Sequence, residues 1–290
     1  MGYQHWHFTK DKEGTAWLEI DVKDSSVNIL RVEVMQEWAE IMKEVAADSS
    51  LTGLCMVSGK PGGFVYGADI AEFNTLASEA DVHNLIALAA SVLSAIEKLD
   101  IPTVCGIDGV AVGGGLEIAL PFDRIVGVGQ RHTKLGFPEI NLGIFPGYGG
   151  TGRALRRVGI KTTLDMVLSG RLLGAEEALS HQLIDRLADD PNSLRDIMRE
   201  ELANPRNPDR VEGDAEFAAA LEAAEEDYCS SAIEAATPAP FEIIQHFKRS
   251  GGDWRKLVTS EGKAFAPLLL GEASYHLRRV FLINDAVRKT

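Results

Sequence analysis

A unit of strand, glycine-rich loop and helix start occurs twice in this chain, and it limits the folds open to the sequence. In the first copy, the apolar run 51–57 is followed by the glycine loop 58–67 (SGKPGGFVYG). In the second copy, the apolar run 103–107 is followed by the loop 108–115 (DGVAVGGG). A helix start follows each loop. Repeated strand–helix units are typical of stacked α/β turns, so the sequence predicts an α/β fold.

The remaining elements divide the chain into two predicted regions. Hydrophobic periodicity predicts further strands over Thr15–Val22, Arg124–Val128 and Leu183–Leu187, and helices over Val32–Ala47, Glu79–Leu99, Arg153–Gly159, Thr162–Ser169 and Ala175–His181. Beyond about Ala188 the pattern is helical, over 215–236, 241–250, 254–270 and 274–289. We therefore predict an α/β core over 1–190 and a helical region over 191–290. Apolar residues on the later helices need a partner surface, which the core or another subunit would provide.

Composition excludes several classes of function. The formal net charge of −14 is unfavourable for binding a nucleic-acid backbone, which needs clustered Lys and Arg. The three cysteines have no C-x-x-C spacing and point to a reducing compartment. The N-terminus lacks an apolar signal region, and no apolar run approaches the roughly 18 residues of a membrane span. We expect a cytoplasmic protein with no membrane span.

The two glycine loops predict a site for an anionic oxygen. Glycines 113, 114 and 115 allow unusual backbone angles and close approach to a ligand. N–H groups at the following helix start favour negative charge. The repeat offers a matched pair of donors, near Ala68 and near Gly114, which together could form an oxyanion hole. Tight strand–helix packing alone would also explain the glycines.

Two glutamates follow these features and could carry protons. Glu117 comes directly after the triple glycine and Glu139 follows Pro138. Paired carboxylates in a dry pocket suit general acid–base catalysis. Each could instead be an ordinary acid in a first helical turn or a turn. The segment 147–152 (GYGGTG) matches G-x-G-x-x-G but lacks the context of a dinucleotide site, and the histidines have no metal-ligand spacing. We expect neither NAD nor a metal.

Four ordered segments resemble the crotonase (enoyl-CoA hydratase/isomerase) superfamily, most closely the hydratase portion of multifunctional fatty-acid oxidation proteins. They are SGKPGGFVYGADIAEF (58–73), GIDGVAVGGGLEIAL (106–120), KLGFPEINLGIFPGYGGTGR (134–153) and LSGRLLGAEEALSHQLID (168–185). The resemblance covers about residues 14–190. It implies a spiral of ββα units with a C-terminal helical region. It further implies a homotrimer or a dimer of trimers.

The resemblance also implies roles for individual residues. The N–H groups of Ala68 and Gly114 would hold a thioester oxygen, Glu117 and Glu139 would be the catalytic acids, and Gly147 would help to place a water molecule. Predicted substrate- or CoA-binding residues surround the first loop: Lys60, Phe64, Gly67, Asp69 and Ile70. Lys60 could equally be an ordinary solvated lysine. The Glu117–Glu139 spacing is about two residues longer than in single-function hydratases.

The implied activity is hydration of trans-2-enoyl-CoA to 3-hydroxyacyl-CoA in fatty-acid β-oxidation. No cofactor is implied, because coenzyme A is part of the acyl-CoA thioester substrate. One alternative is a Δ3-Δ2-enoyl-CoA isomerase, which needs only the carboxylate at Glu139. Another is a non-catalytic acyl-CoA-binding homologue. The multifunctional relatives suggest a dehydrogenase or a thiolase as a partner.

Overall fold

The protein is built from two compact units. The computed structural model describes residues 2–130, 132–204, 206–210, 212–229 and 237–288. The first unit combines Met1–Ala68, Ala87–Leu135 and Leu173–Pro208, and the second combines Asp69–Ile86, Gly136–Leu172 and Asp209–Thr290. Each unit therefore joins segments that are far apart in the sequence.

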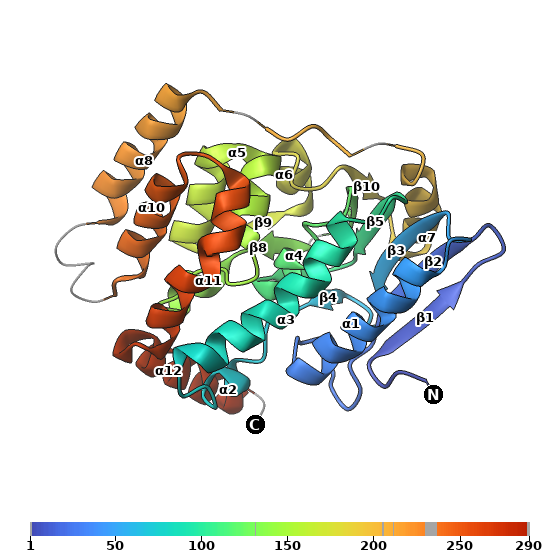
Figure 1. Cartoon of the computed structure of the whole chain (residues 1–290), viewed down its shortest axis with the longest axis horizontal. Helices are drawn as coiled ribbons and strands as arrows, with labels where there is room; N and C mark the ends of the chain where they lie inside the picture. The colour runs from blue at the N-terminus through green and yellow to red at the C-terminus, as the bar shows by residue number, and fades with distance from the viewer. Residues whose placement is uncertain (1, 131, 205, 211, 230–236, 289–290) are drawn as a thin grey trace. The chain divides into compact units, whose positions relative to one another are not determined.

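A six-stranded sheet lies at the centre of the first unit (Figure 1). Its strands, in spatial order, are β1 (Trp6–Lys10), β2 (Thr15–Ile20), β3 (Gly53–Ser58), β5 (Thr103–Ile107), β7 (Arg124–Val128) and β10 (Arg186–Ala188). β1 pairs antiparallel with β2, and the pairs from β2 to β10 are parallel. Strands of a parallel sheet are covered on both faces, which explains why they appear in the sequence as short, continuous apolar runs.

A second sheet carries the short strand of each repeated unit. Its order is β4 (Gly63–Val65), β6 (Val110–Val112), β8 (Lys134–Gly136) and β9 (Leu172–Gly174). A strand of the first sheet leads into a strand of the second three times: β3 to β4, β5 to β6 and β7 to β8. A helical segment follows each pair: α2 (Ile70–Phe73) with α3 (Glu79–Glu97), α4 (Gly114–Glu117), and the 3-10 helix η1 (Pro138–Leu142). The predicted α/β fold of ββα units is confirmed.

Both predicted glycine loops contain strands. β4 lies inside the predicted loop 58–67, and β6 lies inside the predicted loop 108–115. A three-residue strand is too short to show an alternating pattern, so periodicity does not reveal it. β1 was also not predicted, and the last strand lies at 186–188 instead of 183–187.

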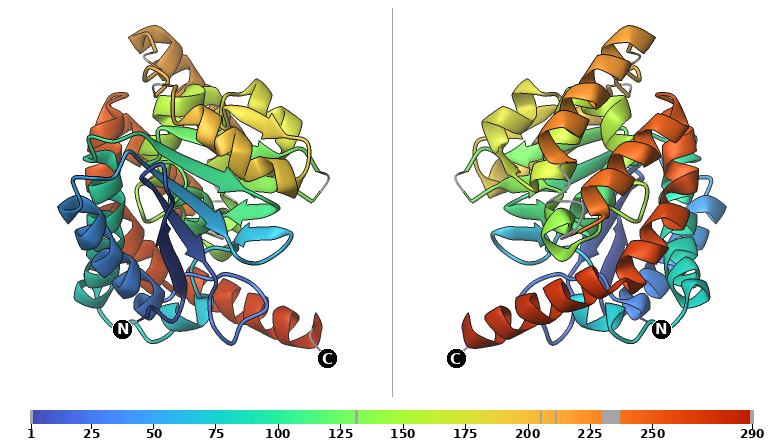
Figure 2. Two further views of the ribbon diagram at one scale, coloured as in Figure 1. Left: turned by 90° about the vertical axis from the view of Figure 1, so that its right-hand side faces the viewer. Right: turned by 90° about the vertical axis from the view of Figure 1, so that its left-hand side faces the viewer.

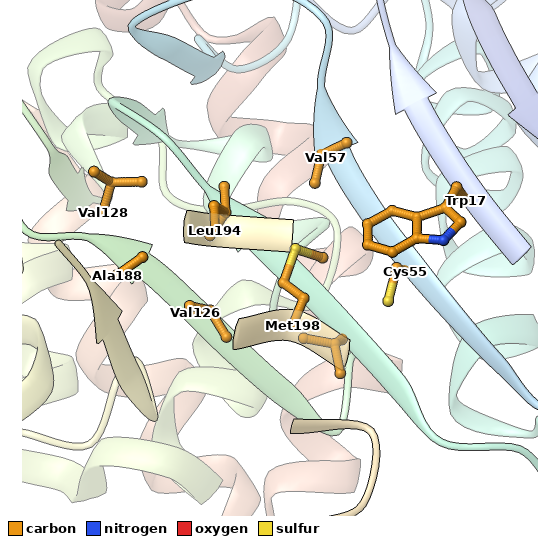
Figure 3. Close-up of a cluster of buried hydrophobic side chains, with 9 residues drawn as sticks. Trp17, Cys55, Val57, Val126, Val128, Ala188, Leu194 and Met198 are labelled. Atoms are coloured by element: carbon orange, nitrogen blue, oxygen red, sulfur yellow. The ribbon is translucent and has the colours of Figure 1, made fainter. Parts of the chain in front are cut away.

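Helix α7 (Pro191–Glu201) covers one face of the large sheet. Asp190 and Ser193 form a capping box at its N-terminus. Leu194 and Met198 of α7 pack into a buried cluster with side chains from β2, β3, β5, β7 and β10 (Figure 3). The complete cluster is Trp17, Cys55, Val57, Val104, Val126, Val128, Ala188, Leu194 and Met198. This packing fixes β3 and β5, the strands that lead into β4 and β6.

Helix α1 (Val32–Ala47) has the bounds that the sequence predicts. Its apolar stripe is buried, and Trp38 packs against Trp6 of β1 with ring centroids 5.0 Å apart and the ring planes tilted by 38°. Both views of Figure 2 show the N-terminal hairpin beside α1, in dark and mid blue. The contact between Trp6 and Trp38 ties α1 to β1, and the segment with Asn28 and Leu30 leads into α1.

The second unit is mainly helical. Its helices are α5 (Gly150–Ser169), α8 (Asp214–Tyr228), α10 (Ala239–Ser250), α11 (Trp254–Leu270) and α12 (Glu272–Arg288); the short α6 (Ala175–Ser180) belongs to the first unit. α5 consists of two helical halves joined at Gly159, which has φ 81° and ψ 173°. α11 packs on α5 and on α10 (Figure 1). Residues 230–236 of the predicted helix 215–236, and Lys289 of the predicted helix 274–289, lie outside the described residues.

One helix among the described residues, α3, has the length and mean hydropathy that a membrane span would need. Helices of folded cores pass the same test, so a single such helix is weak evidence for a membrane. Buried apolar residues recur along it at Val82, Leu85, Ala89 and Val92, which is the spacing of a helix that packs by one face.

Candidate active site

The first predicted donor, the N–H of Ala68, follows a turn at the end of β4. Gly67 has φ +92°, a backbone angle that L side chains rarely adopt. The N–H of Leu30 donates to the carbonyl oxygen of Gly67 at 2.8 Å, and Leu30 pairs with Ala68 in an isolated parallel bridge. In a parallel ladder the amides of one strand point alternately to its two sides. The bridge therefore holds the chain at Gly67 while the Ala68 N–H points away from Leu30.

A buried asparagine fixes the approach to this turn. Asn28 is 1% exposed, and its side-chain amide donates to Ile20 O at 3.1 Å and to Phe64 O at 3.0 Å. Its Oδ1 accepts from Val22 N–H at 2.9 Å. The backbone also contributes, because Tyr66 N–H donates to Asn28 O at 2.8 Å. Asn28 thus ties the ends of β2 and β4 into one rigid arrangement.

The second predicted donor, the N–H of Gly114, is the first amide of helix α4. Gly113 precedes it as N-cap with φ 55° and ψ −131°, a conformation that favours glycine. The first N–H groups of a helix have no acceptor within that helix, so the Gly114 N–H remains available for a ligand. Gly115 approaches Val65 so closely that a Cβ atom would overlap the Val65 carbonyl. The third glycine is therefore required by packing.

The two turns converge inside the first unit. A Cβ atom added to Gly67 would lie 3.1 Å from Val112 O and 3.7 Å from Gly114 N. β4 and β6 are paired in parallel, so their carboxyl ends, which lead to Ala68 and Gly114, lie at the same edge of the sheet. Glycine packing explains this contact, and the same contact brings two backbone donors next to each other.

The two predicted catalytic acids belong to different units. Glu117 is the last residue of α4, is 2% exposed, and donates its N–H to Gly113 O at 3.0 Å. Glu139 lies half-buried in the first turn of η1, which ends at Gly143 in a left-handed conformation (φ 69°). Pro138 provides a fixed φ at the start of η1. The pairing of the two carboxylates across the units stays a prediction.

Gly147 lies in a buried loop that leads into α5. A Cβ atom on Gly147 would lie 3.2 Å from the ring of Phe265 on α11. Gly149, the N-cap of α5, has φ 90°. The carboxylate of Glu261 accepts hydrogen bonds from the N–H groups of Gly149, Gly150 and Thr151 at 2.5, 3.1 and 3.0 Å. The loop is therefore held from α11.

The remaining predicted binding residues have defined local roles. Lys60 is 15% exposed and forms an ion pair with Asp21 at 2.6 Å, so it already has a carboxylate partner. Phe64 is fully buried in β4. Asp69 caps α2, accepting from the N–H two residues on at 2.9 Å, and Ile70 begins that helix. Their contact with a substrate stays a prediction.

Two residues of this region were missed by the sequence analysis. Asn28 lies between the predicted strand Thr15–Val22 and the predicted helix Val32–Ala47. Its side-chain amide donates to Ile20, Ser58 and Phe64, which belong to three separate strands. Glu261 does carry a signal: it lies one turn from Leu257 and from Phe265, on the buried side of α11. A charged residue on an apolar helical stripe rarely stays buried without a specific partner.

Comparison with known proteins places the chain in a family. Residues 12–233 match the family model for enoyl-CoA hydratase/isomerase. The fatty acid oxidation complex subunit alpha of Shewanella halifaxensis is 33% identical over 98% of this chain and 42% of the relative. The same subunit of Shewanella loihica is 39% identical over 67% of this chain and 27% of the relative. The chain thus spans about two fifths or less of the length of these relatives.

Solved structures agree in fold. The enoyl-CoA hydratase from Bacillus halodurans superposes with a TM-score of 0.71, covering 95% of this chain and 99% of that chain at 18% identity. An enoyl-CoA hydratase from Geobacillus kaustophilus has a TM-score of 0.65, covering 98% and 96% at 22% identity. At these identities the superpositions establish the fold. The match to the family model over residues 12–233 shows that this chain belongs to the enoyl-CoA hydratase/isomerase family.

Proposed function

We propose that the protein hydrates trans-2-enoyl-CoA thioesters to 3-hydroxyacyl-CoA. The observation that carries this proposal is the convergence of the two glycine turns, in which a Cβ atom on Gly67 would lie only 3.7 Å from Gly114 N. Two adjacent N–H groups directed at one oxygen would stabilise the enolate-like charge that develops when a thioester is attacked at its β-carbon. In other enzymes one such donor is worth about 3–4 kcal/mol of barrier.

The two glutamates would divide the addition of water between them. Glu117 would accept a proton from a water molecule as its oxygen bonds to C3, and Glu139 would deliver a proton to C2. The N–H of Gly147 would help to orient that water. The burial of Glu117 supports the proposal, because a carboxylate shielded from bulk water is a stronger general base for one held water molecule.

A spectrophotometric assay tests the reaction. Hydration removes the conjugated C2–C3 double bond, so absorbance falls when the purified protein meets enoyl-CoA substrates from C4 to C16. We expect turnover of at least one chain length, and its loss in Glu117→Gln and in Glu139→Gln. Full hydratase rate in Glu117→Gln would refute the role given to that residue. Loss of isomerisation only in Glu139→Gln would favour the Δ3-Δ2 isomerase, and binding without turnover would favour an acyl-CoA-binding protein.

We further propose an assembly from the names of the relatives. They are alpha subunits of fatty acid oxidation complexes, which supports association with a partner such as a dehydrogenase or thiolase. The homotrimer or dimer of trimers and the cytoplasmic location are proposed from the family resemblance alone. Light scattering of the purified protein, alone and with such a partner, tests this assembly. Lys60 remains a weaker candidate for the CoA phosphates, because release from Asp21 would have to accompany binding.

A further inference from the structure

We propose that Glu261 on α11 is a positioning residue, which holds the 147–151 loop so that the Gly147 N–H faces the reacting water; this inference rests on the proposed function. Glu261 is 0% exposed. Its Oε1 accepts from the N–H of Gly149 and Gly150, and its Oε2 accepts from the N–H and the hydroxyl of Thr151. A buried carboxylate with this set of donors has one fixed orientation.

The loop cannot supply this acceptor itself. A helix N-terminus is normally capped by the side chain of its own N-cap residue. The N-cap of α5 is Gly149, which has no side chain and has φ 90°. The acceptor comes instead from 112 residues further along the chain. Removing it would take the Glu261 carboxylate away from three buried amide donors, and the loop would move to make up for the lost hydrogen bonds.

α11 contacts the same loop at a second point. Phe265 lies one turn after Glu261, and its ring would be 3.2 Å from a Cβ atom on Gly147. Between the two contacts, Tyr148 O accepts a hydrogen bond from Arg153 Nη1 at 2.7 Å. The Gly147 peptide is therefore held on one side by the Phe265 ring and on the other by the cap from Glu261.

The contact requires α11 to lie very close to α5. A Cβ atom on Gly152 would lie 2.7 Å from the side chain of Val258 on α11. Gly152 thus allows α11 close enough for the Glu261 carboxylate to reach the amides. The C-terminal helical region consequently determines loop geometry in the part of the protein that carries the family motifs.

A glutamate in the segment that precedes α8 provides a matched control. Glu212 Oε1 accepts from Ile160 N–H at 2.6 Å, beyond the Gly159 break in α5. Glu212→Gln therefore weakens a carboxylate–amide contact to α5 in the same unit, ten residues or so from the loop. A purely structural effect of losing such a contact will appear equally in both variants.

The experiment compares Glu261→Gln, Glu261→Asp and Glu212→Gln in the full chain with the best enoyl-CoA substrate. We expect kcat to fall about ten- to hundredfold in Glu261→Gln with KM changed less than about threefold, because misplacing a group by about 1 Å costs roughly that much rate. Glu261→Asp, which keeps the charge, will recover part of kcat. Glu212→Gln will lower the Tm and keep kcat.

Hydrogen exchange measured by mass spectrometry gives a readout that is independent of turnover. Peptides spanning 147–153 will exchange faster in Glu261→Gln and at the wild-type rate in Glu212→Gln. Unchanged exchange, or a kcat loss in both variants that follows their Tm, overturns the role of Glu261. Absence of hydratase turnover in the wild type at every chain length would instead refute the proposed function, while the exchange rates still decide whether Glu261 holds the loop.

Discussion

Gly67 and Gly114 are in such close contact that a methyl group on the first would lie 3.7 Å from the backbone nitrogen of the second. The substitution Gly67→Ala places that methyl group beside the proposed oxyanion hole and forces alanine to φ +92°. We expect kcat/KM for enoyl-CoA to fall by about 10²–10³-fold, the cost of disturbing one such donor. Steady-state hydration kinetics will measure the loss.

Tyr66→Ala is the matched control for this substitution. Tyr66 is the preceding residue and is 41% exposed. Its replacement leaves the backbone angle of Gly67 intact and is expected to change kcat/KM by less than about tenfold. Equal losses in the two variants would mean that the glycine contact has no special role in rate.

Asn28 is expected to be among the most sensitive polar positions for stability. Asn28→Ala removes three side-chain hydrogen bonds to backbone atoms and leaves buried groups of Val22, Ile20 and Phe64 without those partners. We expect the free energy of unfolding to fall by about 2–5 kcal/mol. Urea unfolding followed by tryptophan fluorescence will measure the change. The exposed neighbour Ser26 serves as control, since Ser26→Ala is expected to stay within about 0.5 kcal/mol.

The stability of the second unit is expected to depend on pH through the buried side chain of His246. Burial, with Arg249 adding to it, lowers the pKa of His246 to about 4 in the folded protein, compared with 6.5 for the exposed side chain. Between these values the unfolded chain binds the extra proton, so stability falls as the pH drops from about 6.5 to 4. We expect this residue to account for about 2–3 kcal/mol between pH 7 and pH 4.5.

Comparison with His246→Gln isolates that contribution. Carboxylates also titrate in this range, but their effect is common to both proteins. The difference in free energy of unfolding between wild type and variant, measured in urea at pH 4.5, 5.5 and 7, should change with pH in the direction stated. A pH-independent difference would show that folding leaves the pKa of His246 unchanged.

The three thiols are expected to react at very different rates. Cys55 and Cys105 are 0% exposed, and burial raises the pKa of the Cys55 thiol to about 12. Cys229 is partly exposed. Because thiolates are the reactive form, Ellman's reagent should modify Cys229 rapidly in the native protein and all three residues only after unfolding. Peptide mapping that found Cys55 labelled first would contradict this.

The sequence predicted the parts of the fold that local patterns encode. β5, β7 and α1 have the predicted bounds because their apolar patterns match buried strands and a one-sided helix. The repeat also led to Ala68 and Gly114, since glycines mark the turns. The strands β4 and β6 were missed, because three residues are too few to show the alternating pattern of a strand.

Residues whose role depends on distant partners were harder to predict. Asn28 and Glu261 each act on backbone groups, and backbone donors leave no mark in the sequence. Their partners lie up to 36 and 112 positions away. Only the folded chain brings these groups together. The position of Glu261 on the buried side of α11 was nevertheless a signal that could have been recognised from the sequence.

The parallel pairing of β4 with β6 has a consequence for protein engineering. Neighbouring strands of any sheet are about 4.8 Å apart, a constant of the polypeptide itself. The gap between the two turns is thus inherited from main-chain geometry and owes little to nearby side chains. Laboratory evolution toward bulkier thioesters should therefore be able to replace the side chains around the proposed site without changing the spacing of the two backbone turns.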